Sequence, residues 1–568
     1  MNRFFRPLIF VFFFSLLSVQ VTLAQSLRPK FERKPSDFDV QHYIIRTRFD
    51  RQKKMVFGDT TVRLKPLKND FNTLLLDAVG MRFQTVRLEP EGKDLNFKTN
   101  DQQIIIKLDR NYSISEELSV RLVYSAKPEK GVYFVDALKK NSKLVHSAQI
   151  WTQGESQESR HWFPSNDFPD DKATTEQFLT VDKGETAISN GELVETIPEQ
   201  DGTVTFHYKM PVVHSTYLTS FIIGNYTKIE DQHGPIPLGF YVYPGQTQLA
   251  QKAFGKTGDM MRIFEEVTGV KYPYNKYDQT MVAGFNLGGM ENITATTLAD
   301  TEIFFANFEF GRGAVYDLVS HELAHSWFGN LVTCKNWSEL WLNEGFATFM
   351  EAVYREKTNG RNDYIRKVKD DADQFMNSYG VSETPHGLYN LLADPNDDDS
   401  MFDTTTYQKG GAVIHTLRET VGDEPFWRAI NIYLQRHKFN SVETTDLQKV
   451  MEEVSGQDLD WFFNQWVRGT GYPRLKVERS FNLQKKTLTL TITQTQEAQG
   501  LTPAVFVLPM NLQIKTKEGI QNEAILVNKR IQTFSLKVNS RPTEIQLDKE
   551  EKIPIKLIKY NSQVQADR

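Results

Sequence analysis

Cysteine is nearly absent from this chain, which has one, Cys334, among 568 residues. The protein therefore cannot form an internal disulfide. Cys334 itself is expected to behave as a small, buried, apolar side chain.

Basic clusters are also missing. The formal net charge is −5, and no run of Lys and Arg with interleaved aromatic residues occurs, so the sequence predicts no nucleic-acid partner. Hydrophobic residues make up 39% and charged residues 24%, which is typical of a globular protein. A chain of 568 residues exceeds what one hydrophobic core supports, so several domains are expected.

Long apolar runs are absent except at the amino end. There Arg3 and Arg6 precede an apolar run that begins at Pro7, and small residues lead to Ala24. This layout predicts a signal peptide over residues 1–24, and the apolar run is too short to favour a membrane span. Its removal takes away two positive charges and changes the formal charge from −5 to −7. An exported protein without disulfides fits a bacterial periplasm or secretion, and no integral membrane span is expected after cleavage.

The rest of the chain changes character twice. Residues 25–228 are rich in short, alternating segments such as "YIIRTRFD" and "LSVRLVYSA", which predict an amino-terminal β-sheet domain. Residues 229–470 carry helical spacing, as in "ELWLNEGFATFMEAVYREK". Short strands return over residues 471–568 and indicate a small β-sandwich. The predicted fold class is multidomain α+β.

The stretch "HELAHSWFGN" opens with His321 and His325, which a helix would place on one face, one turn apart. Two imidazoles on one face can bind zinc, and a catalytic zinc site takes a third protein ligand and a water molecule. Glu344, on the next predicted helix, is the expected third ligand. Glu322 would then be the general base that takes a proton from the zinc-bound water. No third histidine follows six residues after His325, which excludes the histidine-rich endopeptidase pattern.

A second pattern, "GGMEN", covers Gly288, Gly289, Met290 and Glu291. Adjacent glycines let a backbone come close to a ligand, where it can pair with a peptide as an added strand does. Taken alone, the same letters fit a turn with a surface glutamate, and the pattern leaves both interpretations open.

The order "GGMEN", "HELAHSWFGN", "NEGFATFME", "YQKGG" resembles the zinc aminopeptidases of the membrane-alanyl aminopeptidase and leukotriene hydrolase family, the gluzincins. The resemblance covers nearly all of the chain after the signal peptide. It implies a β amino-terminal domain, a thermolysin-like catalytic domain that is mainly helical, and a carboxy-terminal β-sandwich. It also suggests a short, bacterial-type exported member without the large helical carboxy-terminal domain of many relatives.

The resemblance assigns roles to matching residues. Glu291 would bind the free amino group of the substrate, and Gly288 and Gly289 would offer backbone contacts. Tyr407, in "FDTTTYQKGG", matches the tyrosine that stabilises the oxyanion, whereas the sequence alone favours a packing role for it.

Further matches lie upstream, in "TQGESQESRHWFPSNDFP". Gln153 and Glu155 fall where the family places a second amine contact and part of the pocket for the first side chain, and Glu155 is the better candidate for the amine. Met290 is expected to contribute to the same pocket.

The expected function is that of a monozinc aminopeptidase, with one Zn²⁺ per chain and peptides with a free amino terminus as substrates. A zinc endopeptidase or an epoxide hydrolase on the same scaffold, and a catalytically inactive peptide-binding protein, are the alternatives. No oligomeric state is predicted.

Overall fold

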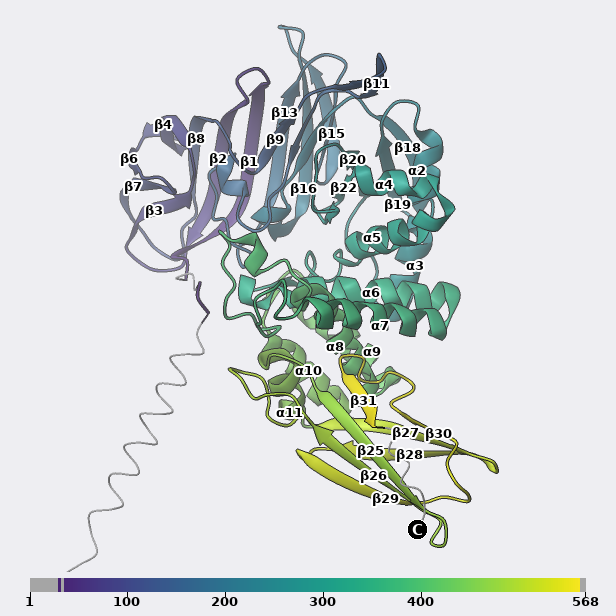
Figure 1. Cartoon of the computed structure of the whole chain (residues 1–568). Helices are drawn as coiled ribbons and strands as arrows, with labels where there is room; N and C mark the ends of the chain where they lie inside the picture. Colours follow the sequence, from purple (N-terminus) through teal and green to yellow (C-terminus); the bar gives the residue numbers. More distant parts are fainter. Residues whose placement is uncertain (1–28, 32–34, 562–568) are drawn as a thin grey trace, which may run out of the picture.

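The computed structural model describes residues 29–31 and 35–561 (Figure 1). The expected signal peptide, residues 1–24, lies outside the described residues. Among the helices that are described, none combines the length and the apolar character needed to cross a membrane. A β-rich amino-terminal part, a mainly helical middle and a β-rich carboxy-terminal part follow one another along the molecule, which confirms the predicted α+β class (Figure 1).

The amino-terminal part is built from strands with alternating burial. Every second residue of β13 (Lys172–Val181) is buried, which is the period of a strand with one face on a core. β1 (Phe38–Asp50) pairs in parallel with β13 and antiparallel with β2 (Met55–Pro66). The other strands are β3 (Phe71–Asp77), β4 (Met81–Glu89), β5 (Lys93–Asp94), β6 (Asn96–Thr99), β7 (Gln103–Tyr112), β8 (Leu118–Ala126), β9 (Val132–Val135), β10 (Leu138–Lys140), β11 (Lys143–His146), β12 (Gln149–Thr152), β14 (Thr186–Ser189), β15 (Glu192–Pro198), β16 (Val204–Ser215) and β17 (Phe221–Gly224).

These strands form three larger sheets and one small ribbon. The largest sheet has the order β15-β16-β13-β1-β2-β8-β4-β5, and smaller sheets have the orders β3-β7-β6 and β14-β17-β12-β9, with β10-β11 as the ribbon. Their inner faces share one hydrophobic core of their own. Strand β12 ends at Thr152, so it delivers the segment that carries Gln153 and Glu155 to the middle of the molecule.

The mainly helical middle also contains a five-stranded sheet, in the order β18-β19-β20-β22-β21. Its strands are β18 (Thr227–His233), β19 (Ile236–Val242), β20 (Tyr277–Val282), β21 (Gly289–Met290) and β22 (Ala295–Ala299). The boundary expected between residues 228 and 229 falls inside β18. β21 pairs antiparallel with β22 and is the edge strand of this sheet.

Helices cover this sheet and connect it to the carboxy-terminal part (Figure 1). The helix α5 (Arg312–Ala324) packs against α6 (Trp341–Asn359), and α6 packs against α7 (Arg361–Ser378) and α8 (Gly410–Val421). The remaining α-helices are α2 (Thr247–Phe254), α3 (Thr257–Thr268), α4 (Asp300–Ile303), α9 (Asp423–His437), α10 (Thr444–Ser455) and α11 (Asp460–Phe463). A short parallel pair, β23 (Thr333–Cys334) and β24 (Ser441–Val442), buries Cys334 completely.

The carboxy-terminal part consists of two sheets with the orders β29-β26-β25-β31 and β28-β27-β30. Buried residues of both sheets belong to one core, as expected for a sandwich, and this core continues into the helical middle. The strands are β25 (Arg474–Asn482), β26 (Thr487–Gln494), β27 (Leu508–Thr516), β28 (Gly519–Val527), β29 (Ile531–Lys537), β30 (Glu544–Leu547) and β31 (Leu557–Asn561).

Candidate active site

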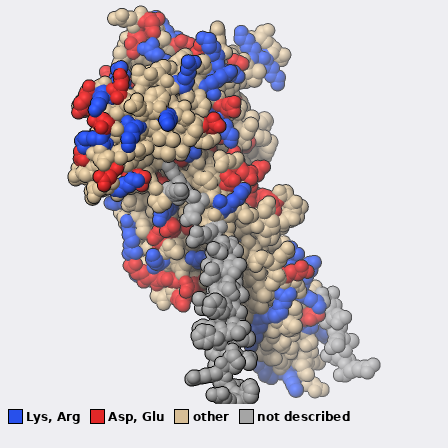
Figure 2. Space-filling model, turned by 90° about the vertical axis from the view of Figure 1, so that its left-hand side faces the viewer, with Lys and Arg blue, Asp and Glu red and all other residues tan. Residues whose placement is uncertain are grey.

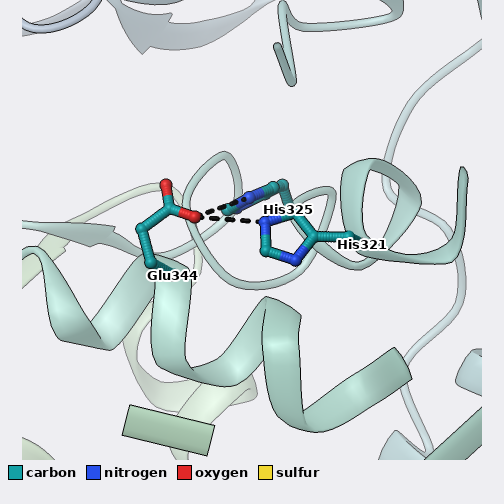
Figure 3. Close-up of side chains that lie close together, drawn as sticks. All are labelled: His321, His325 and Glu344. Carbon is teal, nitrogen blue, oxygen red and sulfur yellow. Dashed lines mark hydrogen bonds and ion pairs between the residues drawn. The ribbon is translucent and has the colours of Figure 1, made fainter. Parts of the chain in front are cut away.

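His321, His325 and Glu344 converge at the packing interface of α5 and α6 (Figure 3). His321 lies in the last turn of α5 and His325 directly follows it, so their rings come from the same helix face. The Oε2 atom of Glu344, in the first turn of α6, lies 3.1 Å from His321 Nε2 and 3.4 Å from His325 Nε2. All three side chains are buried. The structure thus brings the three predicted metal ligands together.

The hydrogen bonds of the two imidazoles orient both Nε2 atoms toward Glu344. His325 Nδ1 lies 2.9 Å from the carbonyl oxygen of Phe328, which can only accept, so Nδ1 carries the hydrogen. In the neutral ring, Nε2 then directs a lone pair at the carboxylate of Glu344. His321 is arranged in the same way, with Nδ1 2.8 Å from Glu351 Oε1. When both rings are neutral, the two Nε2 lone pairs converge on the Glu344 carboxylate, and two nitrogens with one carboxylate oxygen are a ligand set that suits zinc.

Electrostatics at the ligands point the same way. Burial lowers the pKa of His321, but hydrogen bonds to Glu344 and Glu351 outweigh it and raise the pKa to about 9. Burial raises the pKa of Glu344, but His325 and His321 outweigh it and lower the pKa to about 2. In the metal-free chain, protons on the imidazoles thus supply the positive charge beside Glu344 that a bound metal ion would replace.

Glu322 lies against the glycine-rich edge strand. A Cβ atom added to Gly289 would lie 2.0 Å from Glu322 Oε1, so a larger residue here would force the Glu322 side chain to move. Burial raises the pKa of Glu322 to about 8 despite the neighbouring histidines. The side chain is buried, and its carboxylate lines the same cavity as the three ligands. This arrangement fits a general base that is held beside the metal site rather than on it.

Tyr407 reaches the site through a close helix contact. It belongs to the π-helical turn η7 (Thr405–Lys409), which leads into α8. An added Cβ on Gly410 would lie 2.8 Å from the Cα of Gly345, so α8 and α6 touch at these two glycines. The ring of Tyr407 stacks on His321, with 5.9 Å between centroids. Burial, together with the carboxylates around it, raises the pKa of Tyr407 well above its ordinary value, so the phenol keeps its proton as a donor.

Glu291 and Glu155 bring further carboxylates to the centre. Oxygen atoms of Glu155, Glu291 and Glu344 lie within 4.8 Å of one another. The Oε1 atoms of Glu155 and Glu291 are buried without a hydrogen-bond partner among the described residues. Burial raises the pKa of both carboxyl groups, and the charge of Glu291 raises that of Glu155 further. Both carboxyl groups thus keep a buried oxygen open to a hydrogen-bond donor or cation from outside the described chain.

The cavity has a volume of about 250 Å³. It contains most of the predicted site residues but not all of them. Three predicted site residues do not line it: Gly288, which has a φ of +82°, Met290 and Gln153. Met290 and Gln153 are buried and lie next to lining residues in the sequence. Residues that line the cavity are Glu155, Leu287, Gly289, Glu291, Leu318, His321, Glu322, His325, Glu344, Glu351 and Tyr407.

Three residues that shape this site were not predicted from the sequence. Glu351 accepts a hydrogen bond from His321 Nδ1. It could have been found from its position two helical turns after Glu344, on the same face of α6. Leu318 and Leu287 give the cavity an apolar side. Leu318 precedes His321 by one turn, which could have revealed it. Leu287 lies in a loop, where no periodicity applies.

Comparisons with known proteins match the amino-terminal part and the helical middle of this architecture. Residues 252–466 match the peptidase family M1 domain, and residues 39–218 match the peptidase M1 N-terminal domain. The first match includes every candidate ligand, Glu322 and Tyr407.

Related proteins are named as aminopeptidases. Leucyl aminopeptidase of Saccharolobus solfataricus is 30% identical over 73% of this chain and 52% of its own length. Aminopeptidase N of Streptomyces lividans is 34% identical over 58% of this chain and 39% of its own. Aminopeptidase 2 of Candida albicans is 26% identical over 83% of this chain and 51% of its own. The chain thus spans about half the length of the relatives it matches, and with both family domains in order it belongs to peptidase family M1.

Proposed function

We propose that the protein is a zinc aminopeptidase that hydrolyses the first peptide bond of peptides with a free amino terminus. One observation carries the proposal: the unpartnered oxygens of Glu155 and Glu291 lie beside the ligand set of two histidines and Glu344. An α-ammonium group would donate hydrogen bonds to these oxygens, next to the residues that would hold a metal ion. The names of the relatives support this assignment.

His321, His325 and Glu344 would hold the ion. When bound, Zn²⁺ polarises the scissile carbonyl group and makes a water molecule more acidic. Glu291 and Glu155 accept hydrogen bonds from the ammonium group of the substrate, which fixes the first residue at a set distance from the ligands.

The remaining residues move or donate protons. Glu322 takes the proton of the attacking water and passes it to the leaving amine. The hydroxyl of Tyr407 donates a hydrogen bond to the carbonyl oxygen as it gains negative charge. The free edge of β21 can align the substrate backbone as an added strand, with Gly289 leaving room for Glu322.

The test compares a fluorogenic peptide with its amino-terminally acetylated form. We expect cleavage of the free peptide only, release of one residue at a time, loss of activity with a chelator and recovery with Zn²⁺. Equal cleavage of both peptides would instead indicate an endopeptidase. A protein that binds zinc and peptide but cleaves neither form would be the inactive peptide-binding alternative.

We further propose that the mature protein starts at Gln25 and acts outside the cytoplasm. The proposal rests on the pattern of residues 1–24, with two arginines before an apolar run and small residues before the cut. Amino-terminal sequencing of the protein from a periplasmic extract or culture medium tests it. Recovery of the chain with Met1 in the cytoplasmic fraction alone would refute it.

A further inference from the structure

A row of charged side chains of alternating sign leads from His321 to helix α7. Glu351 Oε1 lies 2.8 Å from His321 Nδ1, and Glu351 Oε2 lies 2.9 Å from Lys367 Nζ. Lys367 Nζ also lies 2.7 and 2.8 Å from the two carboxylate oxygens of Asp371. The row therefore runs Asp371, Lys367, Glu351, His321 and crosses from α7 through α6 to α5.

Lys367 is a costly residue to place here. Its side chain is 11% exposed, and those of Glu351 and Asp371 are 12% and 6% exposed. Buried charges require partners in good geometry. The ammonium group has three N–H donors, and the three carboxylate oxygens at 2.7 to 2.9 Å use all of them.

Glu351 is the link between this lysine and the metal site. Its Oε1 accepts a hydrogen bond from the Nδ1–H of His321. This contact fixes the ring plane and leaves Nε2 for a metal. Its Oε2 is held by Lys367. The ammonium group therefore fixes the position and the orientation of the carboxylate that in turn orients the ligand.

A second ion pair holds helices α5 and α6 together. Arg355 of α6 pairs with Asp317 of α5 through both carboxylate oxygens, with Nε 2.8 Å from Oδ1. This pair joins the same two helices one turn away from the row of charges. Loss of Lys367 should therefore leave α5 and α6 together and change the fine orientation of His321.

We propose that Lys367 is a positioning residue for the metal ligand His321 and acts through Glu351. The inference rests on the proposed zinc site, and it adds a residue on α7, 46 positions after His321, to the groups that set metal affinity. Neither Lys367 nor Asp371 lines the cavity, so substrate contact does not account for the buried row.

The test is zinc affinity, measured by competition with a chromophoric chelator, in Lys367→Met, Lys367→Arg and Lys369→Met. Lys369 is the matched control, because it forms the same i,i+4 pair with Asp373 on the exposed face of the same helix. We expect the Kd for zinc to rise roughly 10- to 100-fold in Lys367→Met, as for other residues that orient ligands. The arginine variant should recover part of the loss, and Lys369→Met should stay within about twofold of wild type.

Kinetics separate positioning from general damage. Under saturating zinc, Lys367→Met should regain most of its kcat with KM unchanged, because Glu155 and Glu291 come from other elements. Wild-type zinc affinity in folded Lys367→Met would overturn the inference. If that variant does not fold, wild-type affinity in both Lys367→Gln and Lys367→Arg would overturn it. A wild-type protein that binds no zinc would refute the proposed function instead.

Discussion

Apart from Glu344 and Glu322, the carboxylates in and around the candidate metal site include two groups that differ in what their oxygens contact. The paired carboxylates, Glu351, Asp371 and Asp317, each meet a lysine or arginine at hydrogen-bond distance. The open carboxylates, Glu155 and Glu291, each keep a buried oxygen without a partner among the described residues. Of these five, only the open pair and Glu351 line the cavity, and only the open pair leaves an oxygen there for a group from outside the described chain.

This difference separates positioning from binding. A buried charge with its partner in the chain fixes geometry and affects a ligand only through the residues that it orients. A buried charge without a partner costs stability in the free protein and recovers that cost when a cation binds. The paired carboxylates thus keep the site residues in position, and the open carboxylates are available to bind a cation.

The largest effect on catalysis should come from a substitution of Glu322. This carboxylate belongs to neither group, because its proposed role is to transfer a proton. Glu322→Gln should lower kcat/KM by roughly 10²- to 10⁴-fold, since the amide cannot accept the proton of the attacking water. Zinc content, measured by atomic emission, should stay at the wild-type level. A variant with near wild-type turnover would remove Glu322 from the proposed reaction.

Stability should respond in opposite directions in the two groups. Glu351→Met leaves Lys367 with Asp371 as its carboxylate partner but removes the acceptor of His321 Nδ1, and it should destabilise the zinc-free protein by roughly 1–3 kcal/mol. Glu155→Met removes an unpartnered buried carboxyl and should stabilise it by about 1 kcal/mol. Denaturant unfolding of the zinc-free variants checks both signs. The same sign for both would abolish the distinction between paired and open carboxylates.

Substrate affinity should depend on the open carboxylates and not on the paired carboxylates. Glu291→Gln should raise KM for a free peptide roughly 10- to 100-fold, the worth of a charge-assisted hydrogen bond of about 1.5–3 kcal/mol. Glu302→Gln, an exposed position on α4, is the control and should not change KM. An unchanged KM in Glu291→Gln would exclude this carboxylate from the amine site.

The smallest predicted effect concerns the glycine beside Glu322. Gly289→Ala should lower kcat about tenfold, because the methyl group occupies the place of the Glu322 carboxylate and forces it to turn. Gly313→Ala, in α5 itself, is the control, since an added Cβ there meets nothing within 4 Å. Steady-state kinetics at saturating zinc compare the two, and equal activity would show that Glu322 can move without loss.

Much of the site could be predicted because its chemistry follows helix periodicity. His321 and His325 are four residues apart, and Glu344 lies in the first turn of the following helix, so a regular helix pair brings them together. The three-part division of the chain followed from the change between alternating and helical patterns.

What could not be predicted depends on contacts between distant segments. The residue pattern of β18 and β19 is that of ordinary strands. It does not reveal that β19 pairs with β20, thirty-odd positions later in the chain. The helix that contains Lys367 was evident, but not which of its charges turns inward. Tyr407 reaches His321 through a π-helical turn, which apolar spacing does not distinguish from an α-helix.

The complete burial of Cys334 has a practical consequence. Burial, with the carboxylates of Glu155 and Glu339 next in effect, raises the pKa of its thiol well above the ordinary value, so little reactive thiolate forms. A cysteine introduced at the exposed Leu287, on the rim of the cavity, would be the thiol that maleimide dyes modify. The native sequence thus already provides a nearly silent background for fluorescence measurements of substrate entry.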